Sequence, residues 1–205
     1  GVGVSCVNAL STHMRTEVHR NGKIYVQEYS IGKPLYSVKE IGTTDYRGTI
    51  QTFKPDETIF ITTIYNYDTL ASRLRELSYL NKGISITLTD MREKDEQGNV
   101  RSDEFLSELG LREFVEYIDA NREKLIPECM FFESDKFGIP IEVAMQYNTS
   151  FSENIHSYVN NINTHEGGTH LSGFRRALTR TLKAYAEKEG MLAKLKFDID
   201  GDDFR

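Results

Sequence analysis

One amphipathic pattern, from about Thr169 to Glu189, constrains the fold of this chain more than any other feature. Its apolar residues recur every three or four positions, which is the spacing of one face of an α-helix. They are Leu171, Phe174, Leu178, Leu182 and Tyr185. The pattern therefore predicts a long helix near the C-terminal end, apolar along one side.

The other side of this helix is basic. Arg176, Arg180 and Lys183 lie opposite the apolar stripe, with Arg175 at its margin. A charge pattern of this kind is most often an ordinary solvated face, and the acidic residues in the last turns fit that interpretation. The formal net charge of −6 argues against a surface that binds nucleic acid everywhere, but it leaves room for a local basic patch. The residues alone leave both interpretations open.

Residues 1–90 alternate between strand-like and helix-like segments. The Asn21-Gly22 pair favours a hairpin turn before a strand, and leucines at helical spacing predict a helix that ends before Gly83. The predicted strands are Lys23–Tyr29, Ser37–Ile41, Gly48–Phe53 and Ile84–Leu88, with a further β-branched run at Ile59–Thr63. This pattern indicates an α+β fold, with a helix layer on a mostly antiparallel sheet.

A nearly all-polar stretch, Met91–Glu104, follows and is interpreted as either a solvated hairpin or an interdomain loop. We place a domain boundary at its far side, between residues 104 and 105. Beyond it the sequence predicts a helix at Leu111–Arg122. Strands are predicted at Met130–Glu133, Ile139–Tyr147 and Asn154–Ile162.

The first residues join two glycines, Gly1 and Gly3, to a short apolar segment. Glycine lets the backbone approach an anion, and the first amides of a helix have no partner inside the helix, so this arrangement suits a loop that holds phosphate. A plain tight turn explains the glycines as well. Because the chain has no initiator Met and starts within this motif, we expect it to be a piece of a longer protein.

Two patterns that imitate metal sites fail their structural requirements. His165 and His170 are five rather than four positions apart, and the two glycines between them spoil the helix that a zinc-protease motif needs. In Asp198–Asp203, Gly201 comes too early for a calcium loop and the closing Glu is absent. The sequence therefore predicts no metal ligand. It also predicts no membrane partner, because no apolar run approaches the length of about 18 residues that reads as a membrane helix.

Several motifs, in chain order, resemble the DNA gyrase B family, the ATPase subunits of bacterial type II topoisomerases among the GHKL-type ATPases. Gly1–Ser11 resembles the end of the family's ATP lid, and Arg73–Gly83 resembles the last helix of its ATPase domain. Glu166–His170, followed by Gly173-Phe174, resembles the signature of its transducer domain. The alternatives are the ATPase subunit of topoisomerase IV, which shares much of this set, and a non-enzymatic α+β module that binds nucleic acid or protein.

The resemblance implies two domains. Residues 1–104 would be the distal half of a GHKL-type ATPase sandwich, and residues 105–205 a ribosomal-protein-like α/β transducer domain that is incomplete at its C-terminal end. The complete protein would use ATP and Mg²⁺ and couple ATP binding and hydrolysis to DNA strand passage and negative supercoiling. Its partners would be DNA, the gyrase A protein and a second copy of itself, in the bacterial cytoplasm in association with the nucleoid.

The resemblance also implies roles for single residues, which are carried over by position. Backbone amides of Gly1, Val2 and Gly3 would contact the β- and γ-phosphates of ATP, and Val4 would pack near the base. Thr49 would hydrogen-bond the adenine side of the pocket, Arg20 would lie at the pocket mouth where coumarin-type inhibitors bind, and Arg175 would face the cavity through which DNA passes. No catalytic residue is expected in this chain, because the family's general-base Glu and magnesium-binding Asn lie upstream and its γ-phosphate Lys lies downstream. We therefore expect the chain alone to be inactive.

Overall fold

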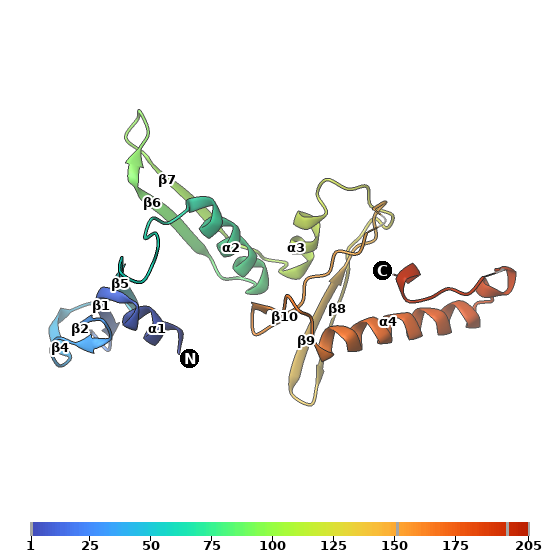
Figure 1. The fold of residues 1–205 in the computed structure, drawn as a ribbon, viewed down its shortest axis with the longest axis horizontal. Helices are drawn as coiled ribbons and strands as arrows, with labels where there is room; N and C mark the ends of the chain where they lie inside the picture. Colours follow the sequence, from blue (N-terminus) through green and yellow to red (C-terminus); the bar gives the residue numbers. More distant parts are fainter. Residues whose placement is uncertain (1, 151, 196, 205) are drawn as a thin grey trace. The chain divides into compact units, whose positions relative to one another are not determined.

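The computed structural model describes residues 2–150, 152–195 and 197–204 (Figure 1). The chain forms two compact units, Gly1–Asn66 and Tyr67–Arg205. Helices and antiparallel strands occur in both units, which confirms the predicted α+β class. None of the helices in the described residues has the length and apolar character that a bilayer crossing requires.

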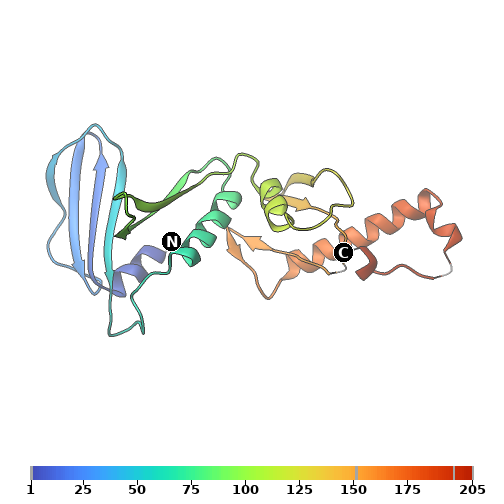
Figure 2. The same ribbon diagram turned by 90° about the horizontal axis from the view of Figure 1, so that it is seen from above.

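The first unit is an antiparallel sheet preceded by a short helix, coloured blue to cyan in Figures 1 and 2. Its elements are α1 (Gly3–Ala9), β1 (Ser11–Arg20), β2 (Lys23–Ser30), β3 (Lys33–Pro34), β4 (Lys39–Thr43) and β5 (Gly48–Pro55). The strand order is β3–β2–β1–β5, and β4 pairs with the other half of β2. The predicted loop-to-helix start and the strands corresponding to β2, β4 and β5 are confirmed, with β4 two residues later than expected. The β-branched run at Ile59–Thr63 forms no strand.

The central strand of this sheet, β1, was not predicted. Its sequence carries polar side chains at most positions, and only Met14 and Val18 give an apolar face. Met14 is nevertheless the best buried apolar side chain of the unit, at 2 % exposure. The turn from β1 to β2 matches the expectation, because Asn21 and Gly22 both have left-handed backbone angles, φ 55° and 76°.

A polar network occupies the opposite face of β1. His19 Nε2 lies 2.7 Å from Glu17 Oε1, while His19 Nδ1 lies 3.1 Å from Thr44 Oγ1. Arg15 holds the second oxygen of Glu17 through an ion pair from Nη2 to Oε2. Hydrogen bonds from His19 and then Arg15 hold the pKa of Glu17 below its ordinary value. The network ties β1 to the segment that precedes β5.

The second unit contains three β-hairpins and three α-helices in its described residues. Its elements are α2 (Tyr67–Leu80), β6 (Ile86–Lys94), β7 (Val100–Phe105), α3 (Leu111–Ile118), β8 (Met130–Lys136), β9 (Ile139–Met145), β10 (Tyr158–Val159), β11 (Ile162–Asn163), α4 (Thr169–Lys188) and the 3₁₀ turns η1 (Met191–Lys194) and η2 (Asp202–Phe204). The polar stretch Met91–Glu104 is a hairpin, the first of the two predicted alternatives. Tyr67, Ala71 and Phe105 form the buried cluster between α2 and this hairpin.

The predicted strand Asn154–Ile162 is wrong. Only two short strands form there, because Asn160 and Asn161 both adopt left-handed backbone angles, φ 50° and 64°, and reverse the chain between them. The turn contacts α2: Arg73 Nη2 donates to the Asn161 carbonyl oxygen at 3.1 Å, and Asn161 Nδ2 donates to Asn81 Oδ1 at 2.8 Å. The turn is therefore held against the C-terminal half of α2.

Helix α3 packs beside α2 through aromatic rings. Tyr79 stacks on Phe114 with ring centroids 5.3 Å apart, and Phe114 also lies near Tyr158. The helix ends at Ile118 rather than near Arg122, with Asp119 as its buried C-cap. Because α2 packs with later elements, the compact units divide at Asn66 and Tyr67. The division into domains at residues 1–104 and 105–205 stays a prediction.

We expect Met14→Ala to lower the free energy of unfolding of the first unit by about 2 to 5 kcal/mol, because it leaves a cavity under the central strand. Urea unfolding measures this. Leu35→Ala is the control, since Leu35 lies in the same unit, is 57 % exposed and loses little packing on truncation. Equal effects of the two substitutions would contradict the burial of Met14.

Candidate functional site

The backbone before α4 fixes where this helix begins. Gly167 has φ 76°, and Gly168 has φ 152° and ψ 179°, a region that only glycine enters readily. A Cβ added at Gly168 would lie 2.8 Å from the His170 ring. The two glycines therefore turn the chain sharply from β11 into the basic helix.

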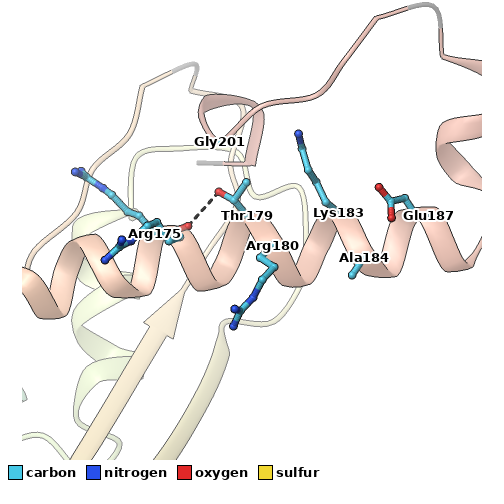
Figure 3. Close-up of a pocket in the computed structure, with 8 residues that line it drawn as sticks. Arg175, Thr179, Arg180, Lys183, Ala184, Glu187 and Gly201 are labelled. Carbon is cyan, nitrogen blue, oxygen red and sulfur yellow. Dashed lines mark hydrogen bonds between the residues drawn. The ribbon is translucent and has the colours of Figure 1, made fainter.

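Helix α4 carries a shallow hollow of about 610 Å³ along one side (Figure 3). Two adjacent rows of the helix line it, because positions four apart stack along one face. The first row is Arg175, Thr179, Lys183 and Glu187, the second is Arg176, Arg180 and Ala184, and Gly201 lies on the chain above them. Four cations thus face the hollow together with one carboxylate. We call this surface the α4 hollow.

The returning C-terminal segment forms part of the α4 hollow. Tyr147 Oη donates a 2.6 Å hydrogen bond to the Phe204 carbonyl oxygen, which ties η2 to the end of β9. Asp200 Oδ1 accepts from the Asp202 amide at 2.7 Å, so the acidic segment forms a local turn. Among the described residues, no group of three or more His, Cys, Asp or Glu side chains is placed to hold a metal ion.

The cations of the α4 hollow differ in their partners. Arg175 makes a two-point ion pair with Glu153: Nε lies 3.1 Å from Oε1 and Nη2 lies 3.0 Å from Oε2. Arg176 Nε donates to the Ser172 carbonyl oxygen. Of the four cations, Arg175 is therefore engaged by a carboxylate, whereas Arg176, Arg180 and Lys183 form no ion pair with a described residue.

The predicted nucleotide residues lie in the first unit. Gly1 is outside the described residues, Val2 is the exposed N-cap of α1, and Gly3 and Val4 form its first turn. No side chain among the described residues caps this turn. Helix α1 leads into β1 at the Ser11 end of the strand (Figure 2).

Thr49 and Arg20 lie at the other end of the sheet. Thr49 pairs with Val18, and Arg20 follows two positions later on β1, so both side chains leave the same face. Thr16 and Gln51 share that face, and Thr16 Oγ1 donates to Gln51 Oε1 at 2.8 Å. The strand pairing thus puts Thr49 and Arg20 on one face of the sheet, whereas Val2, Gly3 and Val4 belong to the start of α1, which contacts β1, β2 and β5.

Sequence reasoning missed two partners of the predicted residues. Glu153 is 22 positions before Arg175, so no local spacing signals their ion pair. The Thr16–Gln51 contact beside Thr49 was missed because β1 itself was not recognised as a strand. The sequence did carry a local signal for the start of α4, the adjacent glycines Gly167 and Gly168, because paired glycines before a helix mark a special backbone conformation.

Comparison with known proteins gives a consistent set of matches. The sequence model of the family described as DNA gyrase B matches residues 110–205. The chain is 63 % identical over 205 residues to the DNA gyrase B protein of Cytophaga hutchinsonii, covering all of this chain and 43 % of that protein. It is 50 % identical over 206 residues to the DNA gyrase B protein of Halalkalibacterium halodurans, covering all of this chain and 32 % of that protein. The chain thus spans less than half the length of these relatives.

A solved structure agrees with the sequence matches. The crystal structure of the 43K ATPase domain of Thermus thermophilus gyrase B in complex with an aminocoumarin superposes with a TM-score of 0.82 and 30 % sequence identity. The match covers 98 % of this chain and 54 % of that one. The likeness therefore extends over both compact units.

We expect Gly168→Ala to destabilise the second unit by about 1 to 3 kcal/mol, because alanine does not readily adopt this backbone conformation and its Cβ would meet His170. Gly173→Ala is the matched control: Gly173 lies inside α4 with open space at its Cβ, so alanine should stabilise the helix by about 0.5 to 1 kcal/mol. Thermal unfolding separates the two. A Gly168→Ala variant as stable as the parent would disprove the required turn.

Proposed function

The chain belongs to the DNA gyrase B family, and from that premise we propose that it forms the part of the gyrase B protein that links a nucleotide pocket to a DNA surface. In the complete protein, ATP binding would close two copies around a DNA segment and hydrolysis would reopen them. Together with the gyrase A protein, this cycle would drive strand passage and negative supercoiling in the bacterial cytoplasm, in association with the nucleoid.

The α4 hollow is the observation that carries the DNA part of this proposal. Arg175, Arg176, Arg180 and Lys183 gather on one helix in a chain whose formal net charge is −6. Phosphate neutralisation by Lys and Arg supplies most of the affinity for a DNA backbone, and it needs no contact with the bases. A strand-passage surface has to accept any sequence, which suits such a contact.

The nucleotide part rests on α1 and β5. The amides of Gly1, Val2 and Gly3 would donate to the β- and γ-phosphates of ATP, and Val4 would pack near the base. The described residues fit this role, since a Cβ added at Gly3 would meet nothing within 4 Å and no side chain caps the first turn of α1. Thr49 would hydrogen-bond the adenine side.

Arg20 would lie at the mouth of this pocket, where coumarin-type inhibitors bind. Its exposed position on the face that carries Thr49 supports that role. The Thermus thermophilus relative was crystallised with an aminocoumarin, so a ligand of this chemical class binds within the matched domain of that protein.

Hydrolysis needs groups that we assign to other parts of the complete protein. Phosphoryl transfer requires a residue that orients water and a metal ion that neutralises developing charge. We propose that a general-base Glu and an Mg²⁺-binding Asn precede this chain and that a Lys contacting the γ-phosphate follows it. The chain by itself would then not hydrolyse ATP. Hydrolysis would take place only in the complete dimer.

The decisive experiment combines the full-length protein with gyrase A and relaxed plasmid DNA. We expect ATP-dependent negative supercoiling and DNA-stimulated ATP hydrolysis. Relaxation and decatenation without supercoiling would instead identify the ATPase subunit of topoisomerase IV. DNA binding without any ATP hydrolysis would support a non-enzymatic binding module and overturn the proposal.

We expect Thr49→Val to weaken the affinity of the full-length protein for ATP about fivefold, the effect of one lost hydrogen bond. Thr52→Val is the control, because Thr52 pairs with Arg15 and leaves the opposite face of the same strand. Isothermal titration with a non-hydrolysable ATP analogue measures both affinities. If Thr52→Val weakens binding as much as Thr49→Val, the assignment of Thr49 fails.

We expect Lys183→Glu to weaken duplex binding several-fold. The slope of log affinity against log salt concentration should also become shallower by about one or more, because a phosphate contact is lost. Lys188→Glu makes the same charge change on α4 outside the hollow and should have a smaller effect. Fluorescence anisotropy of a labelled duplex over a salt series gives both quantities. Affinity for ATP should stay unchanged, and an equal loss of ATP binding would contradict a DNA role for this residue. Charge reversal at Arg175 should likewise reduce the stimulation of ATP hydrolysis by DNA in the full-length protein.

A further inference from the structure

Glu153 is the carboxylate that engages the most N-terminal cation of the α4 hollow. We propose that Glu153 sets the strength of the DNA contact by competing with DNA phosphate for the Arg175 guanidinium. The inference rests on the proposed DNA role of the hollow and adds a residue that lies outside α4. DNA binding at Arg175 would then replace one anion, the Glu153 carboxylate, with another, a DNA phosphate.

The geometry of the pair is that of an anion already bound. A guanidinium presents two parallel N–H groups that match the two oxygens of a carboxylate or of a phosphate. Glu153 takes both points on one edge of Arg175, through Nε at 3.1 Å and Nη2 at 3.0 Å. A phosphate that binds this edge in the same way has to displace the carboxylate.

The pair is placed where such an exchange is feasible. The side chains of Arg175 and Glu153 are 38 % and 33 % exposed, so water and ions reach both. Ion pairs with this much exposure are weak, because solvent screens them. The Arg175–Glu153 pair can therefore open at small cost, whereas a buried pair would resist a phosphate.

The neighbouring cations give the exchange an order. Arg180 and Lys183 have no recorded ion pair with a described residue and line the same hollow. DNA would meet these two cations first, and the held backbone would then raise the local phosphate concentration at Arg175. Release would run in reverse, since Glu153 recaptures Arg175 as the DNA leaves.

Glu153→Gln in the full-length protein tests the competition. We expect the affinity for a short labelled DNA duplex to rise about three- to fivefold, which corresponds to the strength of an exposed ion pair. The matched control is Glu189→Gln, which removes the same charge at the end of α4, outside the lining of the hollow, and no ion pair with Arg175. At about 0.15 M salt, where charges are screened beyond about 8 Å, this control should change the affinity about twofold or less.

A double-mutant cycle then isolates the pair. In an Arg175→Gln background, Glu153→Gln should give no gain beyond that of Glu189→Gln, because the competed group is absent. Equal gains from the two glutamate variants in the parent protein would overturn the proposal, since they would reflect overall charge. Weaker binding by Glu153→Gln would overturn it too, because Glu153 would then orient Arg175 for the phosphate.

A second readout does not depend on DNA. Phenylglyoxal modifies accessible guanidinium groups, and peptide mass spectrometry gives its rate at Arg175. We expect Glu153→Gln to accelerate modification of Arg175 and Glu189→Gln to leave it unchanged. Unchanged reactivity in Glu153→Gln would refute the competition, whereas a parent protein that binds no duplex at low salt would refute the proposed DNA role of the hollow.

Discussion

The position of the α4 hollow depends on the contact between the Asn160–Asn161 turn and helix α2. Hydrogen bonds from Arg73 to the Asn161 carbonyl and from Asn161 to Asn81 fix the turn against the helix. The chain leaves this anchored turn through β11 and reaches α4 only a few residues later, through Gly167 and Gly168. A short segment therefore joins the anchored turn to the start of the basic helix.

This connection explains why left-handed backbone conformations gather in one stretch. Asn160, Asn161, Gly167 and Gly168 all have positive φ values. Asparagine and glycine adopt such angles at the lowest cost, so the chain reverses twice within a few residues without a long loop. The basic helix therefore begins directly after two closely spaced reversals of the chain.

Sequence reasoning succeeded where a pattern is local. The period of the apolar residues identified α2 and α4, and the Asn21-Gly22 pair identified the turn after β1. It failed where pairing decides the structure: β1 lies between two strands although its own sequence is mostly polar, and the segment around Asn160 turns because two residues accept left-handed angles. The Arg175–Glu153 pair was invisible for the same reason, since only the folded chain brings residues 22 positions apart together. The roles of Gly1, Val2, Gly3, Val4, Thr49 and Arg20 came from the resemblance and stay predictions.

In the proposed role, an acidic chain that contacts DNA faces opposing requirements, and the α4 hollow would meet both. Net negative charge repels the duplex over most of the surface, so the contact is confined to the few cations that face the hollow. Strand passage also requires that the duplex be let go, and every unpaired cation added to the surface would slow its departure. A carboxylate that recaptures Arg175 offsets part of the binding free energy when the phosphate leaves. Under this proposal, the same helix would hold DNA long enough to sense it and weakly enough to release it.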